Sequence, residues 1–345
     1  YSLTYSFSSP VSTSDSNKRY VWSSTSGLGQ TLQSNTFSVT AGGTITGAYD
    51  TQWQVTITSS GIGGDSSGTV ATLGGYAKTQ AQLPYTDWFT AGSLSYAFSS
   101  PVSAGSVKQY VWVSTSGMSQ TLQSNTFTLS GTGTITGTYS IQWQVTVTSS
   151  GISTDSTGTV ATLDGAAKTQ AQLPYSAWFN DAYSLTYAFT SPVSTSDSNK
   201  RYVWSSTSGL SQTLQGSTFS VTAGGTITGT YGIEYQVSIT SSGIGGDSSG
   251  TVATLDGDAR TQSQLPYSKW LASGYSLTYS FSSPVSTSDS NKRYVWSSTS
   301  GLGQTLQGST FSVTAGGTIT GTYSIQWQVS ITSSGIGGDS SGTVA

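Results

Sequence analysis

Apolar residues alternate with Ser, Thr or Gln along most of this 345-residue chain. In the clearest case, single polar residues separate Trp53, Val55 and Ile57. A period of two places each apolar side chain on the same face of an extended strand. The pattern predicts strands near 1–7, 20–22, 37–39, 45–49, 53–57, 70–73 and 83–89. No apolar period of 3.6 residues is long enough to predict a helix.

The whole pattern repeats about every 91 residues. A Ser-Pro-Val tripeptide recurs with its proline at 10, 101, 192 and 284, which gives steps of 91, 91 and 92. Residues 1–71 and 275–345 align without a gap and differ at six positions. Seven short strands with Gly, Ser, Asp and Asn turns are typical of an immunoglobulin-like sandwich. We therefore predict an all-β chain of tandem immunoglobulin-like β-sandwich repeats, about 91 residues and about seven strands each.

The repeat boundaries are predicted where two strands meet at a variable position. That position is occupied by Asp50, Ser140, Gly232 and Ser324. This phase gives a partial module of later strands at 1–50, complete sandwiches at 51–139, 140–231 and 232–323, and a partial module of first strands at 324–345. It leaves no flexible linker, which predicts a semi-rigid array. An alternative phase places the boundary around Thr90–Ser93.

The two partial modules have two explanations, and the sequence leaves both open. The chain is a window onto a much longer array, or a neighbouring subunit completes the ends by donating strands. The stretch missing from the ends corresponds to Thr72–Gly92. Tyr1 starts within a repeat, and no signal peptide or 18-residue apolar span is predicted.

Composition favours packed cores and disfavours several partners. Forty aromatic residues (10 Trp, 20 Tyr and 10 Phe) predict order, although only 7% of residues are charged. The chain has no cysteine, so disulfides do not hold the fold. A net charge of −3 with 11 scattered basic residues makes no basic stripe, and no nucleic-acid partner is predicted.

Catalytic chemistry is not indicated either. Histidine and cysteine, the usual general base and nucleophile, are both absent, and Glu234 is the only glutamate. Asp247 and Asp256 occur in Gly-Gly-Asp and Asp-Gly turn signals. We predict that the chain is not an enzyme, with no catalytic site and no cofactor.

Two charged motifs recur beside one another. Asp15, Asp197 and Asp289 begin Asp-Ser-Asn loops rich in the oxygen ligands of Ca²⁺. The second copy reads Ala104-Gly105-Ser106 there, so we predict Asx-type turns and no metal site. The Lys-Arg pairs that follow, beginning with Lys18-Arg19, are predicted to be solvated strand entrances. The alternatives are a contact with an acidic glycan, an intermodule contact, or a lysine isopeptide cross-link.

The tryptophans allow two interpretations. Trp22, Trp53 and Trp88 recur at strand spacing in other copies, which favours burial in the core over stacking on sugars. Trp88, next to Pro84-Tyr85, is predicted to lie at a module junction. The Ser/Thr faces offer hydroxyl acceptors for O-linked glycans.

Several segments resemble repeats of very large archaeal and bacterial cell-surface proteins. They include Tyr-Val-Trp-Ser-Ser-Thr-Ser-Gly-Leu (20–28), Gln-Thr-Leu-Gln-Ser-Asn-Thr-Phe (30–37), Gly-Thr-Ile-Thr-Gly-Thr-Tyr (133–139) and Gln-Trp-Gln-Val-Thr (52–56). The chain is similar in these motifs to S-layer-associated, adhesin and thread-forming arrays. The resemblance implies a cell-surface location, favours an archaeal source, and transfers no binding residue.

The expected function is therefore structural. Near-identical tandem modules generate length, whereas a catalytic centre needs one asymmetric cleft. We expect an extracellular protein that forms a surface filament, thread or stalk and associates with identical chains head-to-tail or laterally. The alternative is an adhesin whose repeated modules each bind carbohydrate.

Overall fold

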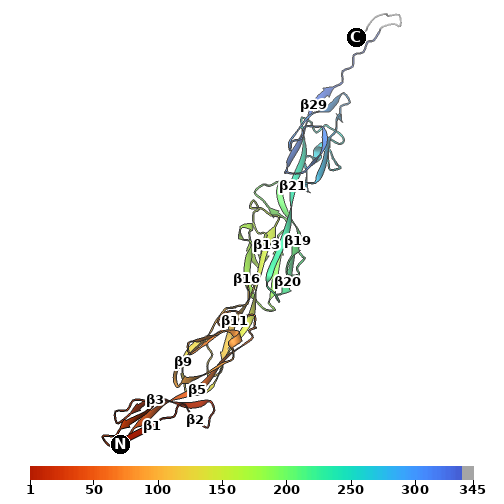
Figure 1. Ribbon diagram of the computed structural model, residues 1–345. Coiled ribbons are helices and arrows are strands. Elements are labelled where there is room, and N and C mark those ends of the chain that lie inside the picture. Colours follow the sequence, from red (N-terminus) through yellow and green to blue (C-terminus); the bar gives the residue numbers. More distant parts are fainter. Residues whose placement is uncertain (336–345) are drawn as a thin grey trace. The chain divides into compact units, whose positions relative to one another are not determined.

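The computed structural model describes residues 1–335, and within that range the chain is almost entirely β-structure (Figure 1). The described residues contain no α-helix, and their only helical segments are 3-10 turns at Gln80–Gln82, Gln170–Gln172 and Gln262–Gln264. None of them is long and apolar enough to cross a membrane. The predicted fold class, tandem β-sandwich repeats of roughly 90 residues, is confirmed.

The strands recur in one order along the chain. The first copy contains β1 (Ser2–Ser6), β2 (Val11–Ser12), β3 (Lys18–Ser26), β4 (Ser34–Ser38), β5 (Thr46–Ser60), β6 (Ala71–Leu73), β7 (Tyr76–Lys78) and β8 (Tyr85–Thr90). The second contains β9 (Gly92–Phe98), β10 (Val102–Ser103), β11 (Lys108–Ser116), β12 (Ser124–Leu129), β13 (Gly133–Ser150), β14 (Ala161–Leu163), β15 (Ala166–Lys168) and β16 (Tyr175–Asn180). The third contains β17 (Ser184–Phe189), β18 (Val193–Ser194), β19 (Lys200–Ser208), β20 (Gly216–Ser220), β21 (Gly225–Ser242), β22 (Ala253–Leu255), β23 (Asp258–Arg260) and β24 (Tyr267–Ala272). The last contains β25 (Ser276–Phe281), β26 (Val285–Ser286), β27 (Lys292–Ser300), β28 (Gly308–Ser312) and β29 (Gly317–Trp327).

Two of the predicted strands are one strand in the structure. The segments predicted at 45–49 and 53–57 lie within β5, which continues through Asp50 without a turn. The very short strands β2 and β7 were not predicted, because two or three residues carry no visible alternation. The other predicted strands are present with boundaries shifted by a few residues.

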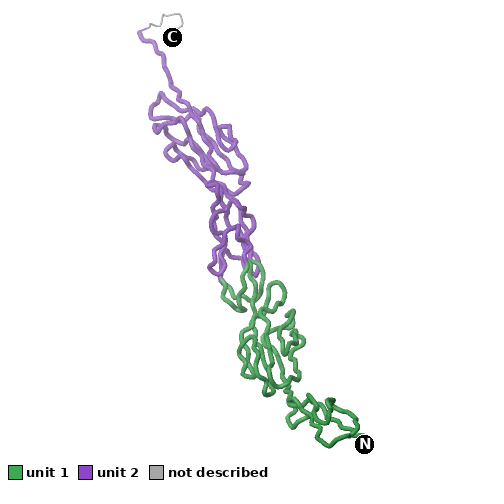
Figure 2. Tube along the Cα trace, turned by 90° about the vertical axis from the view of Figure 1, so that its left-hand side faces the viewer, with its two compact units in different colours: residues 1–146, 176–185, 219–226 green, residues 147–175, 186–218, 227–345 purple. Residues whose placement is uncertain are grey.

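The chain divides into two compact units, which Figure 2 colours differently. Unit 1 comprises residues 1–146, 176–185 and 219–226. Unit 2 comprises residues 147–175, 186–218 and those from 227 on. The finer repeat boundaries given above stay predictions.

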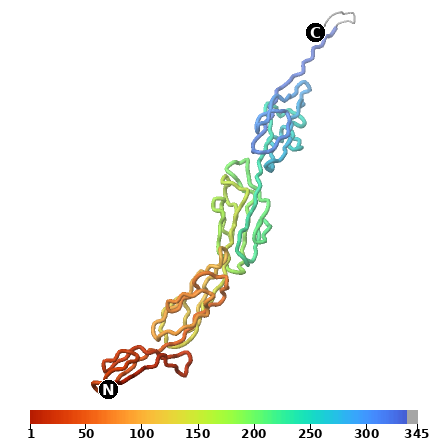
Figure 3. The backbone as a smooth tube through the Cα atoms, viewed as in Figure 1, coloured from red at the N-terminus to blue at the C-terminus, as the bar shows by residue number. Residues whose placement is uncertain are grey.

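Unit 1 contains a sandwich of two sheets. One sheet includes the strands β8-β5-β13-β11-β10 in that order, and the other has the order β12-β9-β6-β7. All neighbours are antiparallel except β5 and β13, which pair in parallel. Figure 3 shows the yellow backbone of β13 returning among the orange backbone of the strands that precede it.

β5 takes part in two sets of pairings. Its first half pairs with β3, from Thr46 opposite Ser26 to Trp53 opposite Lys18. Its second half pairs with β8 on one side and with β13 on the other. A single strand therefore belongs to two successive groups of strands, and no linker separates its two halves.

The core of this sandwich is formed by alternating side chains of both sheets. Its buried members are Val55, Ile57, Val70, Ala71, Leu73, Leu94, Tyr96, Phe98, Val102, Tyr110, Leu129, Ile135 and Tyr139. Unit 2 contains the equivalent sheets, β24-β21-β29-β27-β26 and β23-β22-β25-β28. Its equivalent core runs from Val237 to Tyr323.

Each core depends on one glycine and one tyrosine. A Cβ atom at Gly137 would lie 2.5 Å from the ring of Phe98, so only glycine lets that ring pack on the β13 backbone. The hydroxyl of buried Tyr139 donates to the carbonyl oxygens of Val70 (3.1 Å) and Ser99 (3.0 Å). The tyrosine thereby links both sheets, and its own buried hydroxyl is hydrogen bonded.

The tryptophans lie at the rim of the cores, which corrects the prediction that they are core residues. None of the ten is among the fully buried residues. Trp53 and Trp112 pack against the core of unit 1 while only partly buried. The Trp112 indole donates to the Thr115 hydroxyl at 3.1 Å, so the ring stays where its N–H has a partner.

We expect Gly137→Ala to destabilise the first sandwich of unit 1 by about 1–3 kcal/mol, because the new methyl group collides with the buried Phe98 ring. Urea unfolding followed by circular dichroism measures the change. Gly131→Ala is the matched control, since a Cβ atom there meets nothing within 4 Å. Equal effects of the two substitutions would contradict the packing role of Gly137.

Candidate functional site

A lysine, an aspartate and a tyrosine form a connected polar cluster in unit 1. Asp65 lies in the loop between β5 and β6, and Lys108 and Tyr110 lie on β11. Lys108 Nζ lies 2.8 Å from Asp65 Oδ2, and the Tyr110 hydroxyl donates to Asp65 Oδ1 at 2.6 Å. The Lys108 ammonium also lies 5.3 Å from the centre of the Trp143 ring. The cluster therefore links the loop between β5 and β6 to β11, more than 40 residues later in the chain.

The same cluster occurs twice in unit 2. Its members are Asp155, Lys200 and Tyr202 in one instance, and Asp247, Lys292 and Tyr294 in the other. Each lysine–aspartate distance is 2.7 Å, and each tyrosine–aspartate distance is 2.6 Å. The lysine side chains are only 16–18% exposed, so these ion pairs are partly shielded from water.

The cluster holds both charged groups in their ionised forms. Hydrogen bonds from Lys108 and then Tyr110 lower the pKa of Asp65, and the bond to Asp65 raises the pKa of Lys108. Asp155 and Lys200 shift in the same directions for the same reasons. An isopeptide bond needs a neutral amine attacking a protonated carboxyl, and this environment favours the opposite forms. The geometry therefore describes an ion pair.

Arginine–tryptophan stacks form a second recurring cluster. The Arg19 guanidinium lies 4.4 Å from the centre of the Trp88 ring, and its Nε donates to Gln52 Oε1 at 2.8 Å. In unit 2, Arg201 lies 4.2 Å from the Trp270 ring and pairs with Glu234. The sole glutamate thus has a structural partner. Trp88 thus packs on Arg19 of β3, and its position at a module junction stays a prediction.

The Lys-Arg pairs are therefore not simple solvated strand entrances. Lys18 lies over the rings of Tyr20 and Trp53, 5.1 and 5.2 Å from their centres, and Arg19 covers Trp88. Sequence reasoning did not identify Trp53 and Trp88 as partners because they are distant along the chain. One signal was present: the second copy keeps Lys108 although the residues on both sides of it change, and it keeps Asp155 although Thr154 replaces a glycine.

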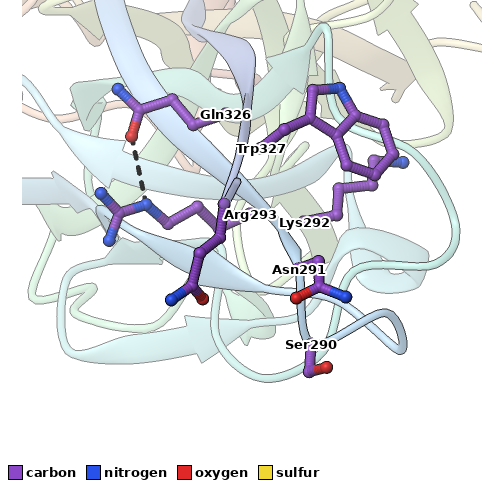
Figure 4. Close-up of a pocket in the computed structure, with 7 residues that line it drawn as sticks. Ser290, Asn291, Lys292, Arg293, Gln326 and Trp327 are labelled. Atoms are coloured by element: carbon purple, nitrogen blue, oxygen red, sulfur yellow. Dashed lines mark hydrogen bonds between the residues drawn. The ribbon is translucent and has the colours of Figure 1, made fainter. Parts of the chain in front are cut away.

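Two hollows lie at equivalent places in unit 2. Figure 4 shows the larger, a cavity of about 570 Å³ lined by Ser290, Asn291, Lys292, Arg293, Gln326, Trp327 and Gln328. Within it, Arg293 Nε donates to Gln326 Oε1 at 3.1 Å. The other, of about 400 Å³, includes Lys200, Arg201 and Trp270. Cations beside an indole suit a sugar or a carboxylate.

The remaining predicted sites are turns. Asp15 Oδ1 accepts from the Asn17 backbone N–H at 2.9 Å, and Asp197 and Asp289 make the same bond in their loops. These are the predicted Asx turns. Asp256 adopts a φ of 52° in a turn and contacts Lys269, whereas Asp247 belongs to the ion-pair cluster. Among residues 1–335 no three acidic, His or Cys groups gather as metal ligands would.

Comparisons with known proteins give no family. No family model and no curated protein matches the chain. The chain is similar to the structure of the Bacillus anthracis TIE protein, with a TM-score of 0.22, 10% identity, and coverage of 90% of this chain and 59% of that one. A Streptococcal ancillary pilin gives a TM-score of 0.17, 8% identity, and coverage of 78% and 99%. The chain thus spans 59% of the length of the TIE protein.

Removing the charge of Asp65 should weaken the first sandwich of unit 1. We expect Asp65→Asn to lower the free energy of unfolding by about 1 kcal/mol, because the neutral amide has no charge to pair with Lys108. The effect is small because about half of the Asp65 side chain is exposed to water, which screens the ion pair. Asp50→Asn makes the same charge change at an exposed position of β5 and serves as the control. Indistinguishable urea midpoints would show that the cluster adds no stability.

Stability should be nearly constant from about pH 5 to 9, since the chain has no histidine to titrate there. The lowered pKa of Asp65, Asp155 and Asp247 gives stability above about pH 4 that is lost as pH falls through the folded values. The raised pKa of Lys108 and the burial-raised pKa of Tyr139 give stability below about pH 10 that is lost at higher pH. Urea titrations across pH 3–11 measure it, and a step near pH 6.5 would contradict the scheme.

Proposed function

We propose that the protein is a structural extracellular repeat protein that builds a filament, thread or stalk on a cell surface. The continuous strand β5 carries this proposal, because it serves two successive groups of strands without a linker. Repeats joined in this way form an extended array and do not enclose a cleft. The proposal includes no catalytic activity, in keeping with a sequence that lacks histidine and cysteine.

The exposed apolar residues at 1–12 and 327–331 agree with lengthwise association. Leu3 and Val11 are 40% and 37% exposed, whereas their equivalents Leu94 and Val102 are 4% and 2% exposed. Val329 and Ile331 are 82% and 74% exposed, whereas Val55 and Ile57 are fully buried. In the proposed filament, these faces pack against further strands, either of a longer continuous array or donated by an identical chain.

Electron microscopy of native material tests the proposal. We expect long filaments or threads at the cell surface with a regular axial repeat. Isolated short particles would contradict the proposal.

The recombinant 345-residue chain separates the two routes to length. Strand donation predicts polymers that disappear in the double variant Val329→Ser/Ile331→Ser, because the donated strand loses its core residues. Gln328→Ala, at the exposed position directly before Val329, is the control. A wild-type chain that stays monomeric at high concentration favours a continuous array.

A carbohydrate-binding adhesin is the second candidate, favoured by the hollow that contains Arg201 and Trp270. It predicts that a binding glycan changes tryptophan fluorescence, and that Trp270→Ala removes this response while Trp22→Phe retains it. A scaffold gives no glycan response in any variant.

A further inference from the structure

The entry and exit strands of each described sandwich are direct neighbours and run in the same direction. In unit 1, residues 55–60 of β5 pair in parallel with residues 133–138 of β13. In unit 2, residues 237–242 of β21 pair in the same way with residues 317–322 of β29. The chain therefore enters a sandwich along one member of the pair and leaves it along the other.

This arrangement fixes how tension acts on the sandwich. A pull on the chain before Val55 and after Thr138 draws the two parallel strands in opposite directions along their own axes. All hydrogen bonds of the pair are then loaded together in shear, and none can open alone. We propose that this parallel pair is a mechanical clamp, which makes each sandwich resist tension applied along the chain.

Both strands of the clamp lie inside their sheet. β8 flanks β5 from Gln52 to Ile57, and β11 flanks β13 from Thr136 to Trp143. Within the pair, Ile57 lies opposite Ile135, and both side chains are fully buried. Water cannot readily replace hydrogen bonds that break beside such side chains, because β8 and β11 cover part of the outer edges of the pair.

Contacts outside the backbone ladder reinforce the clamp. The Ser60 and Thr138 hydroxyls are hydrogen bonded at 3.2 Å, and so are those of Ser242 and Thr322 in unit 2. The Thr132 hydroxyl donates to the Gln54 carbonyl oxygen at 2.6 Å at the other end of the unit 1 pair. Side-chain bonds thus join both ends of that pair.

Glycine permits a close backbone approach where the clamp ends. Gly61 follows the last paired residue with a φ of 75°, and a Cβ atom there would collide with the carbonyl oxygen of Tyr139. Gly243 repeats this arrangement against Tyr323. The two backbones therefore stay in contact one residue beyond the register.

The inference goes beyond the proposed function. A repeat protein can form a filament by association alone, with no special resistance along its chain, and a single sandwich can resist tension without polymerising. Direction of force is the property that distinguishes the clamp.

The absence of cysteine allows the direction of force to be chosen in the full chain. Asp50→Cys with Ser140→Cys attaches handles at opposite ends of the pair and loads it in shear. Asp50→Cys with Ser130→Cys attaches both handles at the same end and peels the strands apart. Either pair releases about 30 nm of chain on unfolding, at about 3.5 Å per residue, so the events are comparable in length.

Single-molecule force spectroscopy at one pulling speed is the test. We expect the shear pair to unfold at a force several-fold higher than the peeling pair. The equivalent handles in unit 2 are Gly232→Cys with Ser324→Cys for shear, and Gly232→Cys with Thr314→Cys for peeling. Equal forces in the two directions would overturn the clamp and leave the filament proposal untouched.

Two core variants provide a second measurement. Ile135→Ala removes a buried side chain of the clamp, and Leu94→Ala removes one from the opposite sheet. Both lower equilibrium stability, but only Ile135→Ala should strongly lower the shear force. An equal loss of force in both variants would show that the whole core resists, and not the pair. The comparison of directions needs no core variant and stands if either fails to fold.

Discussion

The structure depends on keeping one strand unbroken between successive groups of strands. Side chains alternate along a strand, so Tyr49, Val55 and Ile57 all lie on the same face of β5. Inserting one residue between Tyr49 and Val55 would turn one set of core residues to the opposite face. The copies reflect this constraint, because the segment from Thr44 to Ile57 has the same length in all four, whereas the loop before Lys108 and the loop at Asn180–Tyr183 differ in length. The copies thus differ in length at these loops, where an extra residue does not change the register of a strand.

Local patterns predicted the elements, and long-range contacts escaped prediction. The alternation around Trp53 and the turn at Asp15 depend on near neighbours, so the sequence contains the whole signal. The parallel pairing of β5 with β13 joins residues 78 positions apart, and nothing local distinguishes it from an antiparallel partner. The tryptophans were misassigned for a related reason. Hydrophobicity favours burial, but an indole N–H needs an acceptor, and the threonine three residues later supplies one at the rim.

Few charges are present, and most of those described have defined partners. Lysines and arginines at the start of β11 and β19 place their charged groups between an aromatic ring and a carboxylate. Only 7% of the residues are charged, and many of these charges are paired, so Ser and Thr occupy most positions on the outer faces of the strands. Hydroxyl pairs across neighbouring strands, such as Thr56 with Thr86 at 2.8 Å, occupy those faces. The outer surface is thus polar without being strongly charged.

Sharing a strand also couples neighbouring groups of strands. When the second half of β5 separates from β8 and β13, the first half of the strand is no longer held in place at its end. The stability of one group of strands therefore depends partly on its neighbour, as in other repeat proteins. Near-identical copies carry a related hazard, because the strand around Val55 and the strand around Val237 fit equivalent cores. Exchange between copies in one chain and donation between chains use the same complementarity. The sequence similarity that makes misfolding within the array a risk is therefore also what would let identical chains join end to end.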